Sequence, residues 1–285
     1  MKDFSSNPNS IKYYVKKFFY RERKRFSNKT IVDFPAGNGV TSRILKDIGA
    51  HVLAFDLFPE YFKQADIICQ HADINEGLPL ESKAVDAIIC QEGIEHFSDQ
   101  LMALKKFNEL LRPKGSLILT TPNYSNLRAK LSYLLGESER FSASLAANEL
   151  DSIWMLRSKE SQKNKIYFGH VFLIGIERLR CLAKFSGFRI KKIERTKMKY
   201  TSLLLLPLFL PFIYLTNYLA YKRSMKRNTR SSWLEKKKTY GEVFKLATSL
   251  RILTDSHLFV EFEKECDHQD VAKNLHSQSD NFGLT

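Results

Sequence analysis

Residues Ile31–Gly39 have the sequence Ile-Val-Asp-Phe-Pro-Ala-Gly-Asn-Gly. This stretch opens with β-branched residues, as buried strands do, and it closes with two glycines just before a helical pattern at 40–48. Glycine has no Cβ, so a turn of this kind lets backbone amides approach a ligand closely. The stretch therefore predicts the first strand–turn–helix unit of a nucleotide-binding α/β sheet.

Strand and helix patterns alternate along the chain on either side of this unit. Further strands are expected at 51–55, 67–69, 85–90, 115–121, 188–193 and 257–263, and further helices at 100–111 and 174–185. Such alternation is typical of a doubly wound, mostly parallel sheet with helices on both faces, and the count predicts seven strands. Residues 124–168 are polar and basic in places, and we interpret them as a helical cap over the substrate.

Both ends of the chain lie outside this alternation. With 285 residues the chain can bury one substantial core plus appendages, and the main domain is placed at 29–266. Residues 1–28 hold a basic amphipathic helix, which either packs on the domain or contacts a membrane surface. Residues 267–285 are expected to form a disordered tail.

The net charge indicates the kind of binding partner, and the cysteines indicate the cellular compartment. A net charge of +14 favours an anionic partner: a nucleic acid, a phospholipid surface or a phosphorylated substrate. The four cysteines are far apart and form no Cys-x-x-Cys pair, which argues against a zinc site and suits a reducing cytosol. The N-terminus lacks the apolar core of a signal peptide, so we expect a cytoplasmic protein.

An apolar insertion at 201–222 separates the last two expected strands. The stretch from Thr201 to Tyr221 contains no charged residue, and it is long enough for a membrane span. A single crossing would place two strands of one sheet on opposite sides of the membrane. Pro207 and Pro211 are therefore expected to break the segment into a re-entrant hairpin or two in-plane helices. Both flanks are basic, as cytoplasmic flanks are, and a buried hairpin or dimer interface is the alternative.

An acidic residue, Asp56, ends the strand that follows the glycine turn, where a carboxylate can accept both hydroxyls of a ribose. The turn and this acid together suggest an adenosine-containing cofactor. A nicotinamide dinucleotide would require Gly-x-Gly-x-x-Gly, and Ser42 stands in place of the third glycine.

Five motifs in order resemble those of class I S-adenosylmethionine-dependent methyltransferases, over about residues 28–195 plus the last strand. Val32–Gly39 resembles the first motif, Val-Leu-Asp-x-Gly-x-Gly-x-Gly, except that Pro35 replaces its first glycine. Asp86–Phe97 resembles the fourth-strand motif, which ends in Leu-Glu-His-Leu. The others are His71–Ile74, Leu111–Gly115 and Thr120–Asn123.

This resemblance implies S-adenosylmethionine as the cofactor. It implies that the acid of His71–Ile74 contacts the adenine amine while its apolar neighbour covers the ring. The full set of implied cofactor contacts is Asp33, Pro35, Gly37, Gly39, Asp56, Leu57, Asp73, Ile74, Gln91 and Glu92.

Two histidines are candidates for the general base that an alcohol acceptor needs. His96 follows the fourth strand, and His170 lies in a Gly-His-Val segment that the family often carries near the acceptor. The alternative for His96 is a helix-cap or packing role. For His170, a structural role and a catalytic role are equally well supported.

The order Glu-x-x-Glu-His with a distant His also resembles the metal-binding quartet of small-RNA 2′-O-methyltransferases. Glu92, Glu95, His96 and His170 would then hold manganese or iron. Glu-His is widespread in metal-free relatives and no RNA-binding module is present, so we expect no metal and no nucleic-acid partner.

The sequence thus predicts methyl transfer from S-adenosylmethionine, to oxygen, at the cytoplasmic face of an anionic membrane. The acceptor is expected to be a small molecule or a lipid-linked one: a lipid-linked sugar, a surface-glycan precursor or a quinone-like lipid. The protein is expected to be peripheral or monotopic. The alternatives are a metal-dependent RNA 2′-O-methyltransferase and, given Pro35, a binding module without catalysis.

Overall fold

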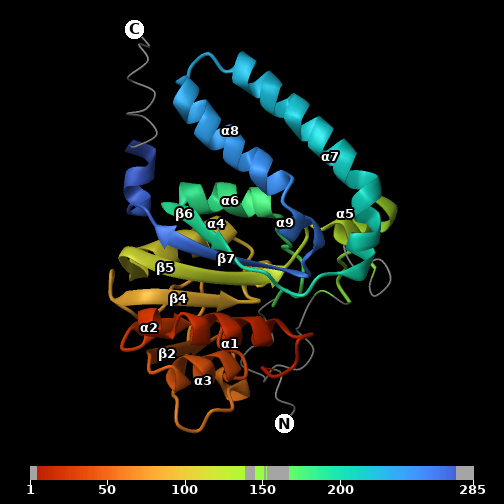
Figure 1. Cartoon of the computed structure of the whole chain (residues 1–285). Coiled ribbons are helices and arrows are strands. Elements are labelled where there is room, and N and C mark those ends of the chain that lie inside the picture. The colour runs from red at the N-terminus through yellow and green to blue at the C-terminus, as the bar shows by residue number, and fades with distance from the viewer. Residues whose placement is uncertain (1–4, 139–144, 151, 153–166, 274–285) are drawn as a thin grey trace.

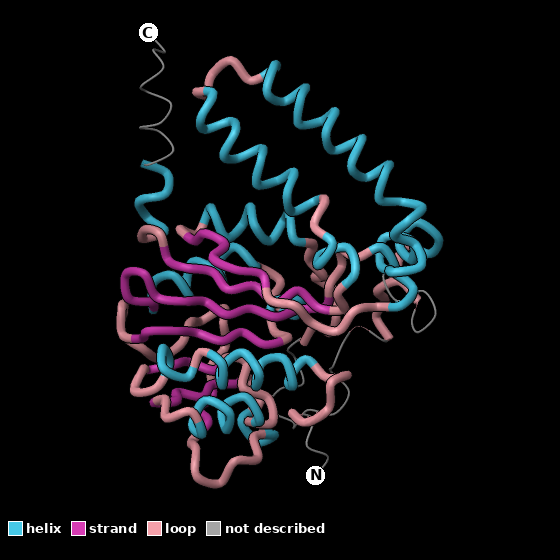
Figure 2. The backbone as a smooth tube through the Cα atoms, viewed as in Figure 1, coloured by secondary structure: helices cyan, strands magenta, loops and turns pink. Residues whose placement is uncertain are grey.

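A computed structural model describes residues 5–138, 145–150, 152 and 167–273. Its centre is a seven-stranded sheet in the order β3-β2-β1-β4-β5-β7-β6, in which β7 runs antiparallel to the six other strands (Figures 1 and 2). The strands are β1 (Thr30–Asp33), β2 (His51–Asp56), β3 (Cys69–His71), β4 (Val85–Gln91), β5 (Leu111–Pro122), β6 (Phe188–Ile193) and β7 (His257–Lys264). The predicted doubly wound, mostly parallel sheet is confirmed.

Helices cover both faces of the sheet, and each face has its own apolar core. The helices are α1 (Ile11–Arg21), α2 (Arg23–Phe26), α3 (Val40–Asp47), α4 (Gln100–Leu110), α5 (Leu127–Gly136), α6 (Ile176–Phe185), α7 (Tyr200–Arg227), α8 (Trp233–Ala247) and α9 (Leu250–Thr254). Short 3₁₀ turns are η1 (Pro59–Tyr61), η2 (Ile94–His96) and η5 (His268–Asp270). One core packs α4 and α6 on the sheet, and the other packs α1 and α3 on the opposite face (Figure 1).

The N-terminal helix is part of the domain. Ile11, Val15, Phe18 and Phe19 are buried, and the Phe18 ring lies 5.2 Å from that of Phe259 on β7. Ser10 caps the helix by accepting a hydrogen bond from the Lys12 amide. Because its apolar face is buried, the packing interpretation is correct and this face is not a membrane contact.

Two predicted segments need correction, and a third is described only in part. The strand expected at 67–69 lies at Cys69–His71, because Ile68 is 81% exposed and its apolar character does not reflect burial. The tail was predicted to be disordered from 267, but Asp267 pairs with Lys264 and η5 follows. Of the predicted cap, α5 is observed, and most of the remainder lies outside the described residues.

The prediction that Pro207 and Pro211 break the apolar insertion is wrong. Both lie inside the continuous helix α7, which a short loop joins to the antiparallel helix α8 (Figures 1 and 2). The two prolines are four residues apart and exposed, so the missing hydrogen bonds fall on one solvent-facing side, where a helix can bend without breaking. The insertion returns to its starting point because Lys199 donates its amide to the carbonyl of Thr254, next to β7.

Candidate active site

The glycine turn and the acid after β2 form one hydrogen-bonded unit. Gly37 and Gly39 adopt left-handed backbone angles, with φ of 52° and 80°. The Gly37 amide donates to Oδ2 of Asp56 over 2.7 Å, and the Phe58 amide donates to Oδ1 over 2.8 Å. Two backbone amides therefore fix the Asp56 carboxylate beside the turn.

Pro35 does not disturb this turn. The Ala36 amide donates to the carbonyl of Phe55, and the Gly39 amide donates to the carbonyl of Ala36, each over 2.9 Å. The proline ring packs on Gly93, where an added Cβ would lie 2.4 Å from the Pro35 Cδ. Pro35 thus joins the end of β1 to the turn after β4.

Asp33 ends β1 as a fully buried carboxyl group. Its Oδ2 accepts a hydrogen bond from the Ser42 hydroxyl over 2.5 Å, whereas its Oδ1 has no hydrogen-bond partner among the described residues. Burial, and secondarily the charge of Asp56, raises the pKa of Asp33 to about 7. A buried oxygen of this kind calls for a donor or a cation from a ligand.

The remaining expected cofactor residues lie at the carboxyl ends of β2, β3 and β4. Leu57 directly follows β2, and the Tyr167 ring lies 4.7 Å from that of the next residue, Phe58. Asp73 and Ile74 come after β3, and the Asp73 carboxylate accepts the Asn75 amide. Gln91 accepts the Thr41 hydroxyl over 2.6 Å.

Glu92 follows Gln91 and is held by β5. Its backbone is left-handed, with φ of 50°, and its amide donates to the carbonyl of Thr120 over 3.0 Å. Its Oε1 accepts the Thr120 hydroxyl, also over 3.0 Å. The carboxylate therefore has a defined position at the edge of the sheet.

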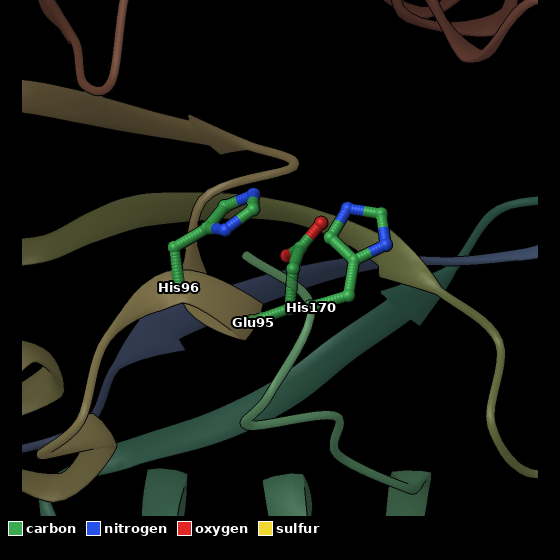
Figure 3. Close-up of side chains that lie close together, drawn as sticks. All are labelled: Glu95, His96 and His170. Carbon is green, nitrogen blue, oxygen red and sulfur yellow. The ribbon is translucent and has the colours of Figure 1, made fainter. Parts of the chain in front are cut away.

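Beyond Glu92, the side chains of Glu95, His96 and His170 lie close together (Figure 3), with one ligand atom from each within 4.8 Å of the others. The two imidazole centroids are 5.1 Å apart. The Glu95 carboxyl accepts the Thr121 hydroxyl, and burial, followed by the charge of Glu92, raises its pKa to about 8. Three of the four residues of the predicted quartet therefore form one cluster, and Glu92 is not in it.

The hydrogen bonds of His96 identify its tautomer. Its Nδ1 lies 2.9 Å from the carbonyl oxygens of both Phe168 and Gly169, which can only accept hydrogen bonds. Nδ1 therefore carries the proton, and in the neutral ring the lone pair lies on Nε2. This is the form that a general base needs.

Sequence reasoning missed two residues at this edge. Lys12 of α1 donates to the Asn38 side chain in the glycine turn over 2.7 Å, and burial lowers its pKa. His257, the first residue of β7, lies beside Glu92. The sequence shows Lys12 only as one of many basic residues on a helix and His257 only as the first residue of a strand, so neither contact could be predicted from it.

The fold and this site define a class I, S-adenosylmethionine-binding methyltransferase, and comparison with known proteins agrees. The sequence model of a family described as "Methyltransferase domain" matches residues 10–193. The chain belongs to this family, and it is an S-adenosylmethionine-dependent methyltransferase.

Curated relatives match over shorter stretches. The ubiquinone biosynthesis O-methyltransferase of Xanthomonas campestris is 32% identical over 102 residues, 33% of this chain and 43% of the relative. The mitochondrial enzyme of that name from Schizosaccharomyces pombe is 30% identical over 132 residues, 41% of this chain and 47% of the relative. The chain thus spans less than half the length of these relatives.

A solved structure agrees on the fold alone. The S-adenosylmethionine-dependent methyltransferase of Archaeoglobus fulgidus superposes with a TM-score of 0.52 at 13% identity, over 92% of this chain and 98% of that one.

The residues present fit this cofactor. The glycine turn leaves space beside Gly37, where an added Cβ would meet nothing within 4 Å. Asp56 would accept the ribose hydroxyls, and the orphaned Oδ1 of Asp33 would suit the cationic methionine end.

Proposed function

We propose that this methyltransferase methylates a hydroxyl oxygen of a quinone-like or other lipid-linked acceptor, at the cytoplasmic face of an anionic membrane. The observation that carries the proposal is the exposed apolar face of α7 beside a basic cluster. The names of the curated relatives, which are O-methyltransferases of ubiquinone biosynthesis, support the acceptor class.

The chain's own residues bind, orient and accept a proton in this proposal. Bound S-adenosylmethionine supplies a methyl group that is already activated on a sulfonium sulfur. Asp56 and Asp33 hold the cofactor's ribose and its cationic end. Nε2 of His96 takes the proton of the acceptor hydroxyl as its oxygen gains the methyl group.

The membrane-facing stripe consists of the exposed apolar residues of α7, which recur every three or four positions and so share one face: Leu204, Leu208, Phe212, Leu215 and Leu219. Another side of α7 packs on α8, where the rings of Tyr214, Tyr218 and Tyr221 surround Phe244. Exposed basic side chains follow the stripe: Lys222, Arg223, Lys226, Arg227 and Arg230. An apolar face next to positive charge is what an anionic bilayer surface binds.

The hairpin favours contact in the plane of the membrane over a crossing. Within the described chain, α7 is the one helix long and apolar enough to span a bilayer. A span would force α8 to return through the hydrocarbon, and α8 carries charged residues: Glu235, Lys236, Lys237, Lys238, Glu242 and Lys245. Because charges inside a bilayer are costly, α7 lies on the surface with its stripe immersed.

A hollow between α5 and α7 supports a lipid-like acceptor. It has a volume of ≈ 230 Å³ and is lined mainly by apolar side chains: Leu131, Leu135, Leu204 and Leu205, with Arg128, Ser132 and Thr201. It lies next to the sheet edge, since Ser202 of α7 contacts Asn126 and accepts the Arg128 amide. A hydrocarbon chain in this hollow would be continuous with the membrane-facing stripe.

Sedimentation with phosphatidylglycerol-containing vesicles tests the membrane part of the proposal. We expect the wild-type protein to bind these vesicles and the triple variant Leu208→Ser, Phe212→Ser and Leu215→Ser to remain in solution. Ile68→Ser removes a still more exposed apolar side chain from a remote loop and should bind as wild type does. Equal binding by the triple variant and wild type would overturn the membrane proposal.

A second candidate function rests on the Glu95–His96–His170 cluster and the net charge of +14. One carboxylate and two imidazoles suit manganese or iron, and a basic chain suits RNA. A metal-dependent RNA 2′-O-methyltransferase would methylate a short RNA only with added Mn²⁺ and would lose activity in chelator. The lipid proposal predicts no RNA methylation and activity that survives chelation.

A further inference from the structure

His257 occupies an unusual position for a residue at the start of a strand. Because β7 runs antiparallel to β5, its first residue pairs with Pro122, at the end of β5. The start of β7 thus reaches the sheet edge at which the neighbouring parallel strands end. This is the edge that carries Gln91, Glu92 and the acceptor-side histidines.

The contacts of His257 lead directly to Glu92. Its Nε2 lies 3.4 Å from Oε2 of Glu92, and its Nδ1 lies 2.9 Å from the Ser256 hydroxyl. The other carboxylate oxygen of Glu92 accepts the Thr120 hydroxyl. The Glu92 carboxylate is thus held between β5 on one side and β7 on the other.

These contacts imply a tautomer opposite to that of His96. A carboxylate facing Nε2 makes this nitrogen the donor, so in the neutral ring Nδ1 accepts the hydrogen bond from Ser256. We therefore expect the neutral His257 ring to carry its proton on Nε2, next to Glu92, whereas His96 carries its proton on Nδ1. The two rings therefore differ in what they offer: His96 a lone pair on Nε2, and His257 a donor.

We propose that His257 is a positioning residue that holds Glu92 in the orientation required for binding S-adenosylmethionine, and that the Ser256 hydroxyl holds the orientation of the ring through Nδ1. The left-handed backbone of Glu92 and its two bonds to Thr120 leave one carboxylate oxygen to be directed, and His257 directs it. The inference rests on the cofactor role of Glu92 and is independent of the acceptor.

Calorimetric titration of the full chain with S-adenosylmethionine tests the role. We expect His257→Ala to weaken cofactor binding about tenfold, and His257→Gln, whose amide can still donate to Glu92, to recover most of it. Because His257 acts through Glu92, the Glu92→Ala and His257→Ala double variant should bind no more weakly than Glu92→Ala alone. Additive losses, or a His257→Gln variant as weak as His257→Ala, would overturn the proposal.

His268 provides the matched control. It forms a second His–Glu pair, with Nε2 2.7 Å from Oε1 of Glu109, at the C-terminus of α4. His268→Ala should leave cofactor binding unchanged, and thermal melting of each variant checks that it is folded.

The tautomer itself is measured on wild-type protein without any ligand, so it separates this inference from the cofactor assignment. In long-range ¹H–¹⁵N spectra of histidine-labelled protein, we expect His257 as the Nε2–H form and a shift of its signals in Ser256→Ala. An Nδ1–H ring at His257 would contradict the positioning role, even if the cofactor binds as expected.

Discussion

The Gly37 amide and the Asp56 carboxylate are joined by a 2.7 Å hydrogen bond. The bond links the glycine turn after β1 to the acid after β2, so the two halves of the expected adenosine site are built as one piece. A change in either residue should therefore affect the other, and the turn should lose its shape when the acid is removed.

Asp56→Ala should weaken S-adenosylmethionine binding more than tenfold, because it removes the ribose acceptor and frees two amides, those of Gly37 and Phe58. Calorimetry measures the change. Asp47→Ala, an exposed acid at the end of α3, is the control and should bind as wild type does. Retained affinity in Asp56→Ala would remove Asp56 from the cofactor site.

Asp33 should make stability depend on pH. Its folded pKa, about 7, lies above the ordinary value of 3.8, so folding favours the protonated form. Its stabilising contribution is present below about pH 4 and is lost as the pH rises toward 7. The unfolding free energy of Asp33→Asn relative to wild type should therefore increase by roughly 4 kcal/mol between pH 4 and pH 8. Urea melts at several pH values measure it, and a difference that does not change with pH would contradict the buried carboxyl account.

His96→Asn separates the two functions of His96. The asparagine amide can still donate to the carbonyls of Phe168 and Gly169, but it offers no basic nitrogen at the Nε2 position. With a quinone-like lipid that carries a free hydroxyl group as the acceptor, kcat should fall by roughly 10²–10⁴, while cofactor affinity stays unchanged. An unchanged kcat would show that His96 is not the general base. His170 would then be the candidate, and kcat should fall in His170→Asn instead.

Lys12 should matter for the cofactor although it lies on the N-terminal helix. Lys12→Gln removes a cation that bonds to Asn38 and whose charge lowers the pKa of the buried Asp33, so cofactor binding should weaken several-fold. Lys17→Gln, on the exposed side of the same helix, has no such contact and serves as the control. Equal cofactor affinity of the two variants would show that Lys12 does not contribute to cofactor binding.

Much of the fold could be predicted because buried parallel strands consist mainly of apolar residues. The segments at β1, β4 and β5 are mainly apolar and lie beside periodic helices, which fixes their type and order. The strand β3 was misplaced because it has only three residues and stands at the edge, where exposure removes the pattern.

The insertion was harder to predict, because packing decided its shape. Each proline was read as a break, yet α7 continues through both, with α8 against its tyrosines. The start of α8 was visible in principle: Ser232 and Glu235 form a capping box, which the pattern Ser-x-x-Glu signals.

The expected cofactor residues could be placed at the sheet edge because they follow strands in a fixed order, whereas the side chains that contact them could not be predicted. His257 reaches Glu92 through the antiparallel pairing of β5 and β7, and Lys12 reaches Asn38 through the packing of α1. Nothing local in the sequence marks either contact.

Transfer of radiolabel from methyl-labelled S-adenosylmethionine shows whether a membrane lipid accepts the methyl group. The purified enzyme would be incubated with membranes from cells that lack it, and the lipid fraction would then be extracted and counted. We predict label in an alkali-stable, lipid-soluble product with wild-type enzyme and none with His96→Asn. Binding of the cofactor without label in any lipid fraction would contradict the proposal that the enzyme methylates a membrane-held acceptor.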